Sequence, residues 1–169
     1  MPFELNAENA AAYLAYRGLA PLDPAIEAEE LAGGVSATVI AVRDPASGLA
    51  VVVKQALARL RVNDEWLATQ RRTETEVAAM RLCAELTPGS VPRVLDADPE
   101  QHVMVMELLP AGAPNWQAEI GEGRVHAEAG RWAGSTLGRW HEATSDSREA
   151  ASAFDDFEAF EQLRLRPFL

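Results

Sequence analysis

Residues 49–58 read LAVVVKQALA, and this stretch decides which fold the chain adopts. Three consecutive valines after a Ser-Gly turn are typical of a buried strand. Lys54 follows them and is the only lysine in a chain that otherwise carries its positive charges on arginine. Such a lysine could bury its stem and keep its ammonium group in water, or it could offer a compact positive charge to a phosphate oxygen. The neighbouring segments must decide between these two interpretations.

Composition and charge exclude several classes of protein. The chain has 169 residues, of which 48% are hydrophobic and 24% charged, as is typical of a globular domain. A net charge of −11 argues against a nucleic-acid partner, which would require a basic surface. No apolar run approaches the roughly 18 residues of a membrane span, and residues 1–10 lack the features of a signal peptide. We therefore expect no membrane partner and a cytoplasmic location.

Cysteine and histidine are too few to build a cross-link or a metal site. Cys83 is the only cysteine, which excludes an internal disulfide and suits a reducing compartment. Three scattered histidines and one cysteine make no plausible zinc site. We expect no metal site formed by this chain alone.

The segments around residues 49–58 predict an antiparallel meander followed by a helix. A Gly-Gly turn and an Asp-Pro-Ala-Ser-Gly turn separate the first three expected strands. An N-terminal helix, capped by Asn6 and closed by Gly18, precedes them. The predicted elements are, in order, a helix over 6–16, strands over 28–31, 37–42 and 49–56, a helix over 69–86, and two strands within 92–109.

Residues 110–114 read PAGAP and form the clearest linker in the chain. The rest predicts helices near Trp116, over 125–141 and over 155–163. We therefore expect one domain over 1–109 and the first helices of a second, incomplete one over 110–169. The predicted fold is α+β: a five-stranded antiparallel sheet with one long helix against it, then a partial helical lobe.

The lone lysine and one glutamate are predicted to meet. Side chains alternate along a strand, so Lys54 shares a face with Val52. In the long helix, a rotation of about 100° per residue places Glu76 on an apolar stripe and Glu74 on the solvent side. The other members of that stripe are Ala79, Met80 and Cys83. A buried carboxylate needs a partner, and Lys54 is the natural one. Alternatively, Glu76 lies at the edge of the stripe and reaches water.

Gly33 and Gly34 lie between the first two expected strands. They would let backbone N–H groups approach an anion without interference from Cβ atoms. A Gly-Gly pair between strands is also a common hairpin turn. The pattern matches neither the dinucleotide-binding fingerprint nor a P-loop.

The last expected strand alternates Val and Met and runs into the linker, where two domains would meet. Small ligands usually bind at such boundaries. A flat apolar base would fit between Val52 and either Met104 or Met106, with its polar edge against backbone groups of residues 107–109. The alternative is an ordinary core strand.

A glycine turn, a strand lysine, a helix acid and a strand leading into a linker, in this order, resemble the nucleotide lobe of a kinase. More specifically, the chain resembles the N-terminal half of the aminoglycoside-phosphotransferase-like small-molecule kinases, relatives of choline kinase and, in particular, methylthioribose kinase. The resemblance rests on GGVSATV, VVVKQA, RRTETEVAAM and VPRVLDADPEQHVMVMELLP. It extends through LRVNDEW, NWQAEI, LGRWHEAT and FDDFEAFEQLRLRPFL.

The resemblance implies that the chain binds ATP. Lys54 would hold the α- and β-phosphates, Glu76 would steer Lys54, and the glycine loop would cover the phosphates. The binding residues that it implies are Gly33, Gly34, Val35, Ser36, Val39, Val52, Lys54, Glu76, Met106, Glu107 and Leu109. Ala37 stands where many relatives have Asn, which removes one side-chain contact to the phosphates.

The family's transfer chemistry lies in an H-G-D-x-x-x-x-N loop, and the sequence does not contain it. His141, for example, is followed by Glu-Ala-Thr. We therefore expect the chain to be inactive alone, with the catalytic residues and the Mg²⁺ ligands C-terminal to Leu169. Helices that pack on a missing lobe would expose Trp and Leu side chains, so we also expect self-association.

The reaction implied for the full-length protein is transfer of the ATP γ-phosphate to a hydroxyl group of a sugar, an aminoglycoside or an amino alcohol. Two other functions stay open. One is a non-catalytic nucleotide-binding or interaction module, and the other is a structural domain whose lysine only keeps its ammonium group in water. Titration with ATP separates the structural domain from the kinase and from the nucleotide-binding module.

Overall fold

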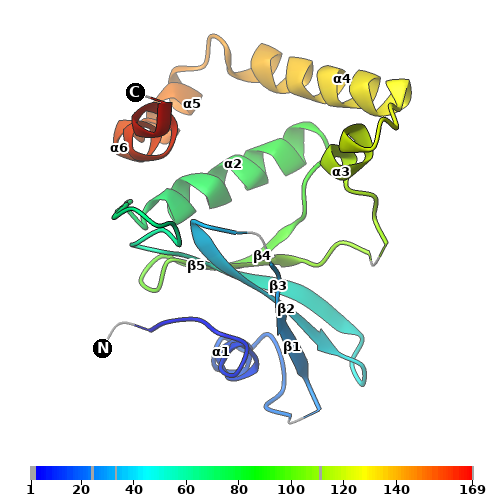
Figure 1. Cartoon of the computed structure of the whole chain (residues 1–169), viewed down its shortest axis with the longest axis vertical. Coiled ribbons are helices and arrows are strands. Elements are labelled where there is room, and N and C mark those ends of the chain that lie inside the picture. Colours follow the sequence, from blue (N-terminus) through cyan, green and yellow to red (C-terminus); the bar gives the residue numbers. More distant parts are fainter. Residues whose placement is uncertain (1–2, 24, 33, 111, 169) are drawn as a thin grey trace.

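The computed structural model describes residues 3–23, 25–32, 34–110 and 112–168 and contains a five-stranded sheet with a helix on each face (Figure 1). The strands lie in the order β1-β2-β3-β5-β4, and all neighbours are antiparallel. The predicted α+β class and antiparallel sheet are confirmed. The elements up to the linker are α1 (Ala10–Tyr16), β1 (Glu27–Glu30), β2 (Ala37–Asp44), β3 (Leu49–Ala56), α2 (Arg72–Leu86), β4 (Val94–Asp98) and β5 (Val103–Glu107).

Strand β3 lies at the centre of the sheet, and its bounds are those predicted. It pairs with β2 on one side and β5 on the other, so Val53 lies opposite both Ile40 and Val105. All three side chains are buried. A central strand that is covered on both faces needs apolar side chains at consecutive positions. This explains why residues 51–53 show no alternation with polar residues.

Helix α1 covers the sheet face opposite to α2 (Figure 1). Leu5 and Leu14 pack there with Ile40, Val53 and Val105 in the hydrophobic core. The sequence predicted only one helix against the sheet, so that prediction was incomplete. The seven residues AAAYLAY are apolar on all sides, and a helix without a polar face gives no signal of which side it buries.

The start of α1 was also predicted one turn too early. The backbone N–H of Asn6 donates to the Asn9 side chain at 2.9 Å, and that of Asn9 donates to the Asn6 side chain at 3.0 Å. These reciprocal bonds hold a turn before the helix, which begins at Ala10. Gly18 ends the helix with a φ angle of 72°, as predicted.

The helices after the linker differ in part from the prediction. Those expected near Trp116 and over 125–141 are α3 (Trp116–Gly121) and α4 (Ala127–Thr144). Helix α5 (Arg148–Ala153) was missed, although Ser147 caps it by accepting from the Ala150 N–H at 3.0 Å. The last predicted helix is not continuous. It comprises α6 (Phe157–Phe160), a π-helical turn (Glu161–Leu165) and a 3₁₀ turn (Arg166–Phe168).

Helix α4 packs against α2, where the Trp140 indole N–H donates to the Thr87 hydroxyl at 2.7 Å. None of the helices in the described ranges combines the length and the apolar composition that crossing a membrane would need.

Arg17 links the end of α1 to β4. Its guanidinium donates to both carboxylate oxygens of Asp96, at 2.7 and 3.0 Å. The hydrogen bond and charge of Arg17 lower the pKa of Asp96. Tyr13 adds a hydrogen bond from its hydroxyl to Asp98 at 3.0 Å. These contacts fix α1 against the edge of the sheet.

Replacing Arg17 by Ala should lower the free energy of unfolding by about 1 kcal/mol at pH 7. The side chains of Arg17 and Asp96 are 28% and 23% exposed, so solvent screens part of their attraction. The folded-state pKa of Asp96 lies below its unfolded value, so its contribution is complete at neutral pH and is lost as the pH falls through the folded-state pKa. Urea unfolding at pH 7 and near pH 3 should therefore show the difference from wild type shrinking in acid.

Arg43→Ala is the matched control for this prediction. Arg43 pairs with Glu29 at 3.9 Å, and both side chains are more exposed. Its loss should change the unfolding free energy by less than about 0.5 kcal/mol. Equal effects of the two substitutions would contradict the anchoring role of Arg17.

Candidate functional site

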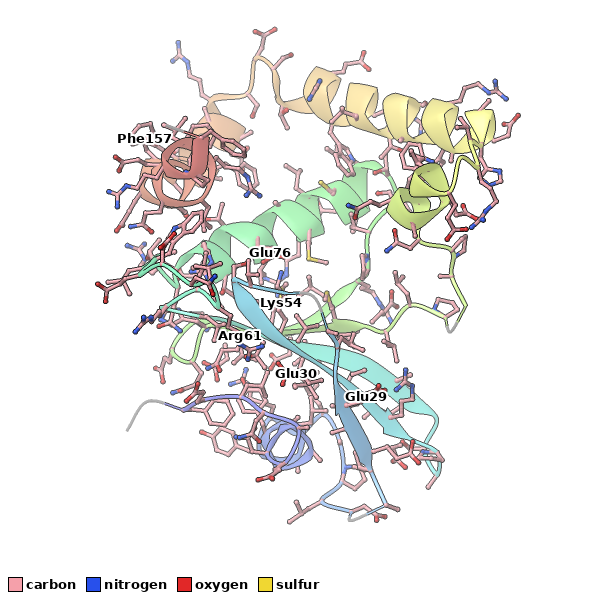
Figure 2. The ribbon with its side chains drawn as sticks, viewed as in Figure 1. Glu29, Glu30, Lys54, Arg61, Glu76 and Phe157 are labelled. Atoms are coloured by element: carbon pink, nitrogen blue, oxygen red, sulfur yellow. The ribbon has the colours of Figure 1, made fainter. Side chains whose placement is uncertain are left out.

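Lys54 and Glu76 face each other between the sheet and α2 (Figure 2). Lys54 pairs across the ladders with Val39 and Met104, so all three lie on one face of the sheet. Glu76 comes from the second turn of α2. The Lys54 Nζ donates a hydrogen bond to Glu76 Oε1. The ion pair predicted from the sequence is therefore present.

Glu76 nevertheless lies at the edge of the buried stripe of α2. The buried residues of this helix are Thr73 and Val77, whereas the predicted stripe of Ala79, Met80 and Cys83 is only partly buried. Thr73 is buried although it is polar, because its hydroxyl donates to the His102 backbone oxygen at 3.3 Å. Counting apolar residues therefore misplaced the stripe.

This position leaves the ion pair accessible from solvent. The side chain of Lys54 is 24% exposed, and that of Glu76 is 39% exposed. A ligand can therefore reach the ammonium group without opening the core. Glu74 is exposed, as predicted, and lies 3.9 Å from Arg71.

Of the two glycines predicted to approach an anion, Gly33 falls outside the described residues. At Gly34 an added Cβ atom would come within 3.0 Å of the Ala37 backbone oxygen. A larger residue would therefore require the turn to shift by a few tenths of an ångström, which favours glycine here.

Residues 57–68, which the sequence left unassigned, hold the turn before β2. The Arg61 backbone N–H donates to the Val35 oxygen at 2.8 Å. Its guanidinium contacts the Glu30 carboxylate at 2.6 Å and the Thr38 hydroxyl at 2.7 Å. Arg61 and Glu30 lie close together in Figure 2. The segment therefore fixes the position of the turn through both backbone and side-chain contacts.

The sequence analysis missed Arg72, which links α2 to the turn before β2 and to the loop at residues 57–69. It stands in the first turn of α2, where a positive charge opposes the helix dipole. A positive charge at this unfavourable position could have indicated that Arg72 has a structural role. Burial lowers the pKa of Arg72, and the nearby charge of Glu76 opposes this effect. Its guanidinium donates to the backbone oxygens of Ser36, Leu57, Ala68 and Thr69.

A cavity of about 940 Å³ lies beside the ion pair. Lys54 and Glu76 form part of its lining, together with Val35 and Ser36 from the turn before β2. Trp66 and residues 154–168, which we call the C-terminal segment, form other walls. This size is in the range of small-molecule sites. One wall is charged, and the C-terminal segment adds aromatic side chains.

The other predicted binding residues do not line this cavity. Val39, Val52 and Met106 share the sheet face of Lys54, because Val39 pairs with Lys54 and Val52 with Met106. Leu109 is exposed beyond the end of β5. The structure thus gathers four of the predicted phosphate-binding residues, Val35, Ser36, Lys54 and Glu76, and leaves Gly34 and the predicted base-binding residues outside the cavity. The residues outside the lining are Gly34, Val39, Val52, Met106, Glu107 and Leu109.

Glu107 makes contacts of its own on the opposite sheet face. Its carboxylate accepts from the Arg93 backbone N–H at 3.0 Å and from the Arg93 guanidinium at 2.9 Å, and these contacts lower its pKa. The Glu107 N–H donates to the Arg93 oxygen at 3.0 Å, and the Leu108 N–H to the Ala50 oxygen at 3.3 Å. These two N–H groups are therefore engaged, and a backbone N–H donor to a ligand base would have to come from Leu109.

The chemistry offered by these residues is anion binding. Lys54 supplies a compact positive charge that a carboxylate positions, beside a turn that contains glycine. Phosphate oxygens are suited to such an ammonium group. Within the described ranges, no three His, Cys, Asp or Glu side chains gather closely enough to hold a metal ion.

Comparison with known proteins gives one family. Residues 27–167 match the model of the phosphotransferase enzyme family. The methylthioribose kinase of Pectobacterium atrosepticum is 32% identical over 132 residues, which cover 78% of this chain and 33% of that protein. The methylthioribose kinase of Yersinia pseudotuberculosis is 31% identical over 129 residues, or 76% of this chain and 31% of the relative. The resemblance to this family is confirmed, and the chain spans about a third of the length of these relatives.

Replacing Arg72 by Met should lower the free energy of unfolding by about 2–4 kcal/mol. The substitution keeps most of the apolar stem and leaves four partly buried backbone oxygens without their donor. Urea unfolding measures the loss. Arg71→Met is the control, because the Arg71 side chain is 79% exposed and its 3.9 Å distance to Glu74 is too long for a hydrogen bond. A loss no larger than that of the control would exclude the linking role of Arg72.

Proposed function

Because the chain belongs to the phosphotransferase enzyme family, we propose that it binds ATP in the cavity beside Lys54 and Glu76. The observation that carries this proposal is the ion pair between these two residues, held between the sheet and α2 beside the turn at residues 34–36. A compact ammonium group on a strand, oriented by a helix carboxylate, is the arrangement that kinases use for the α- and β-phosphates.

In this proposal the chain's own residues divide the work of binding. Lys54 donates charge-assisted hydrogen bonds to the phosphates. Glu76 keeps the ammonium group in place, and Arg72 holds the backbone of the turn at Ser36. The backbone of residues 34–36 covers the phosphates.

The base is proposed to bind on the same sheet face. Val39, Val52 and Met106 offer apolar side chains there. The backbone at Leu109 meets the polar edge of the base. This part of the proposal is supported by the shared face and by the family.

For the whole protein we propose transfer of the ATP γ-phosphate to a hydroxyl group of a small molecule. Two of the relatives are named methylthioribose kinases, which favours a sugar hydroxyl as the acceptor. The non-catalytic alternative is not favoured, because both the family and these relatives are described as phosphotransferases or kinases. A cytoplasmic location stays a prediction.

The roles of the two parts of the chain are also proposals. Residues 1–109 act as the nucleotide lobe, and residues 110–169 contribute to a helical second lobe. Residues 1–169 contain no H-G-D sequence to orient an acceptor, and the described residues offer no cluster for Mg²⁺. Residues 1–169 alone therefore bind ATP without turnover, and they self-associate through exposed apolar side chains such as Trp132 and Phe157.

Lys54→Ala should weaken ATP binding about tenfold to a hundredfold, which corresponds to the loss of a charge-assisted contact. The fold should remain, because Glu76 is accessible to water once its partner is gone. Lys54→Arg should also bind ATP poorly, because a planar fork does not replace a point charge. Isothermal titration calorimetry measures affinity, and circular dichroism checks folding. Equal ATP affinity in all three proteins would exclude this function for Lys54.

Glu76→Gln should weaken ATP binding, whereas Glu74→Gln should leave it unchanged within about twofold. The two residues lie on the same helix, but only Glu76 bonds to Lys54. The same calorimetric titration compares the two variants at constant salt. Similar losses in both would mean that α2 as a whole, and not its contact with Lys54, determines affinity.

A further inference from the structure

The C-terminal segment is docked on the loop that precedes α2, and α6 lies beside that loop in Figure 1. The Gln162 backbone oxygen accepts from the Trp66 indole N–H at 3.0 Å. The Gln162 side-chain oxygen accepts from the Thr69 N–H at 2.6 Å. Asp156 adds a contact to α2 itself, where its carboxylate accepts from the Thr75 hydroxyl at 2.9 Å. One glutamine thus connects segments more than 90 residues apart.

This docking makes the C-terminal segment a wall of the cavity that contains Lys54, and Arg164 is part of that wall. The guanidinium of Arg164 contacts the Leu163 backbone oxygen at 3.2 Å, and within the described ranges it forms no ion pair. Arg166, two residues further on, lies 3.6 Å from Glu161 and does not line the cavity. Arg164 therefore lines the cavity without an ion-pair partner among the described residues, whereas Arg166 is paired with Glu161 outside the cavity.

The other charged groups that line the cavity already have partners. Lys54 is bonded to Glu76. Arg72 donates to four backbone oxygens. The Asp156 carboxylate accepts from Thr75 and, at 3.1 Å, from the Ala159 N–H. A nucleotide brings several negative charges on its phosphates, and a single lysine whose charge is offset by Glu76 leaves most of them unmatched.

We propose that Arg164 supplies a second positive charge to the phosphate groups of the bound nucleotide, and that Gln162 is the positioning residue that holds Arg164 at the cavity. This inference rests on the proposed function, because it requires a nucleotide in the cavity. A guanidinium group suits the role, since its planar fork can donate two parallel hydrogen bonds to one phosphate.

The test measures the affinities of ATP, ADP and adenosine by calorimetry for wild type, Arg164→Ala and Arg166→Ala. Arg164→Ala should weaken ATP binding about fivefold to thirtyfold, ADP binding less, and adenosine binding by no more than about twofold. Arg166→Ala should bind all three ligands as wild type does. Arg164→Lys should recover part of the ATP affinity, because it restores the charge but not the fork.

Gln162→Ala tests the positioning role. It removes the side-chain bond to the Thr69 N–H and keeps the backbone bond to Trp66. It should lower ATP affinity, and Arg164→Ala should cost less affinity in this background than in wild type, because a loosened segment holds Arg164 less well at the cavity. Additive losses in the double variant would overturn the role of Gln162. The adenosine affinity checks that the remaining site is intact in each variant.

Two results would overturn the role of Arg164: unchanged ATP affinity in Arg164→Ala, or an equal loss of ATP and adenosine affinity. The Lys54→Ala variant separates this outcome from failure of the proposed function. If wild type binds ATP and only Lys54→Ala loses affinity, the nucleotide site stands and the Arg164 inference is wrong. If wild type does not bind ATP, the proposed function fails and the inference fails with it.

Discussion

The candidate site of this molecule depends on one ion pair, between a lysine on the central strand and a glutamate on the helix that covers it. Lys54 lies among valines, where a positive charge is costly unless a carboxylate is close. Glu76 supplies that carboxylate from the edge of the buried stripe of α2. The edge position matters, because it lets the charges meet while both remain accessible to solvent. A fully buried pair would carry the full cost of desolvation and could not meet a ligand.

The surroundings of the pair are held by arginine contacts to backbone oxygens. Arg72 joins the turn at Ser36 to the loop at Leu57, Ala68 and Thr69, and Arg61 joins the same loop to the turn at Val35. Carbonyl groups in irregular segments lack the partners that helices and strands provide, so a partly buried guanidinium with five donors can satisfy several at once. The loop and the turn therefore keep a defined geometry without regular secondary structure.

The cavity beside the ion pair is formed by parts of the chain that are distant in sequence. The turn before β2 and α2 form one side, and the C-terminal segment forms another. Gln162 and Asp156 fasten that segment through polar contacts, which are directional and therefore fix its placement more closely than apolar packing alone. The residues that match the family, 27–167, include the lysine, the acid and the turn. The wall contributed by residues 154–168 is a feature that only these contacts reveal.

The sequence by itself determined the central strand, the antiparallel meander and the partnership of Lys54 with Glu76. These follow from short-range rules: side chains alternate along a strand and repeat every 3.6 residues along a helix. The face covered by α1, the buried position of Thr73, the contacts of Arg72 and the docking of Gln162 were decided only in the tertiary structure. Each depends on a partner that is distant in sequence, such as the His102 oxygen for Thr73 or Trp66 for Gln162. A local pattern shows that a polar group needs a partner, but only the folded chain decides which distant group lies within hydrogen-bonding distance.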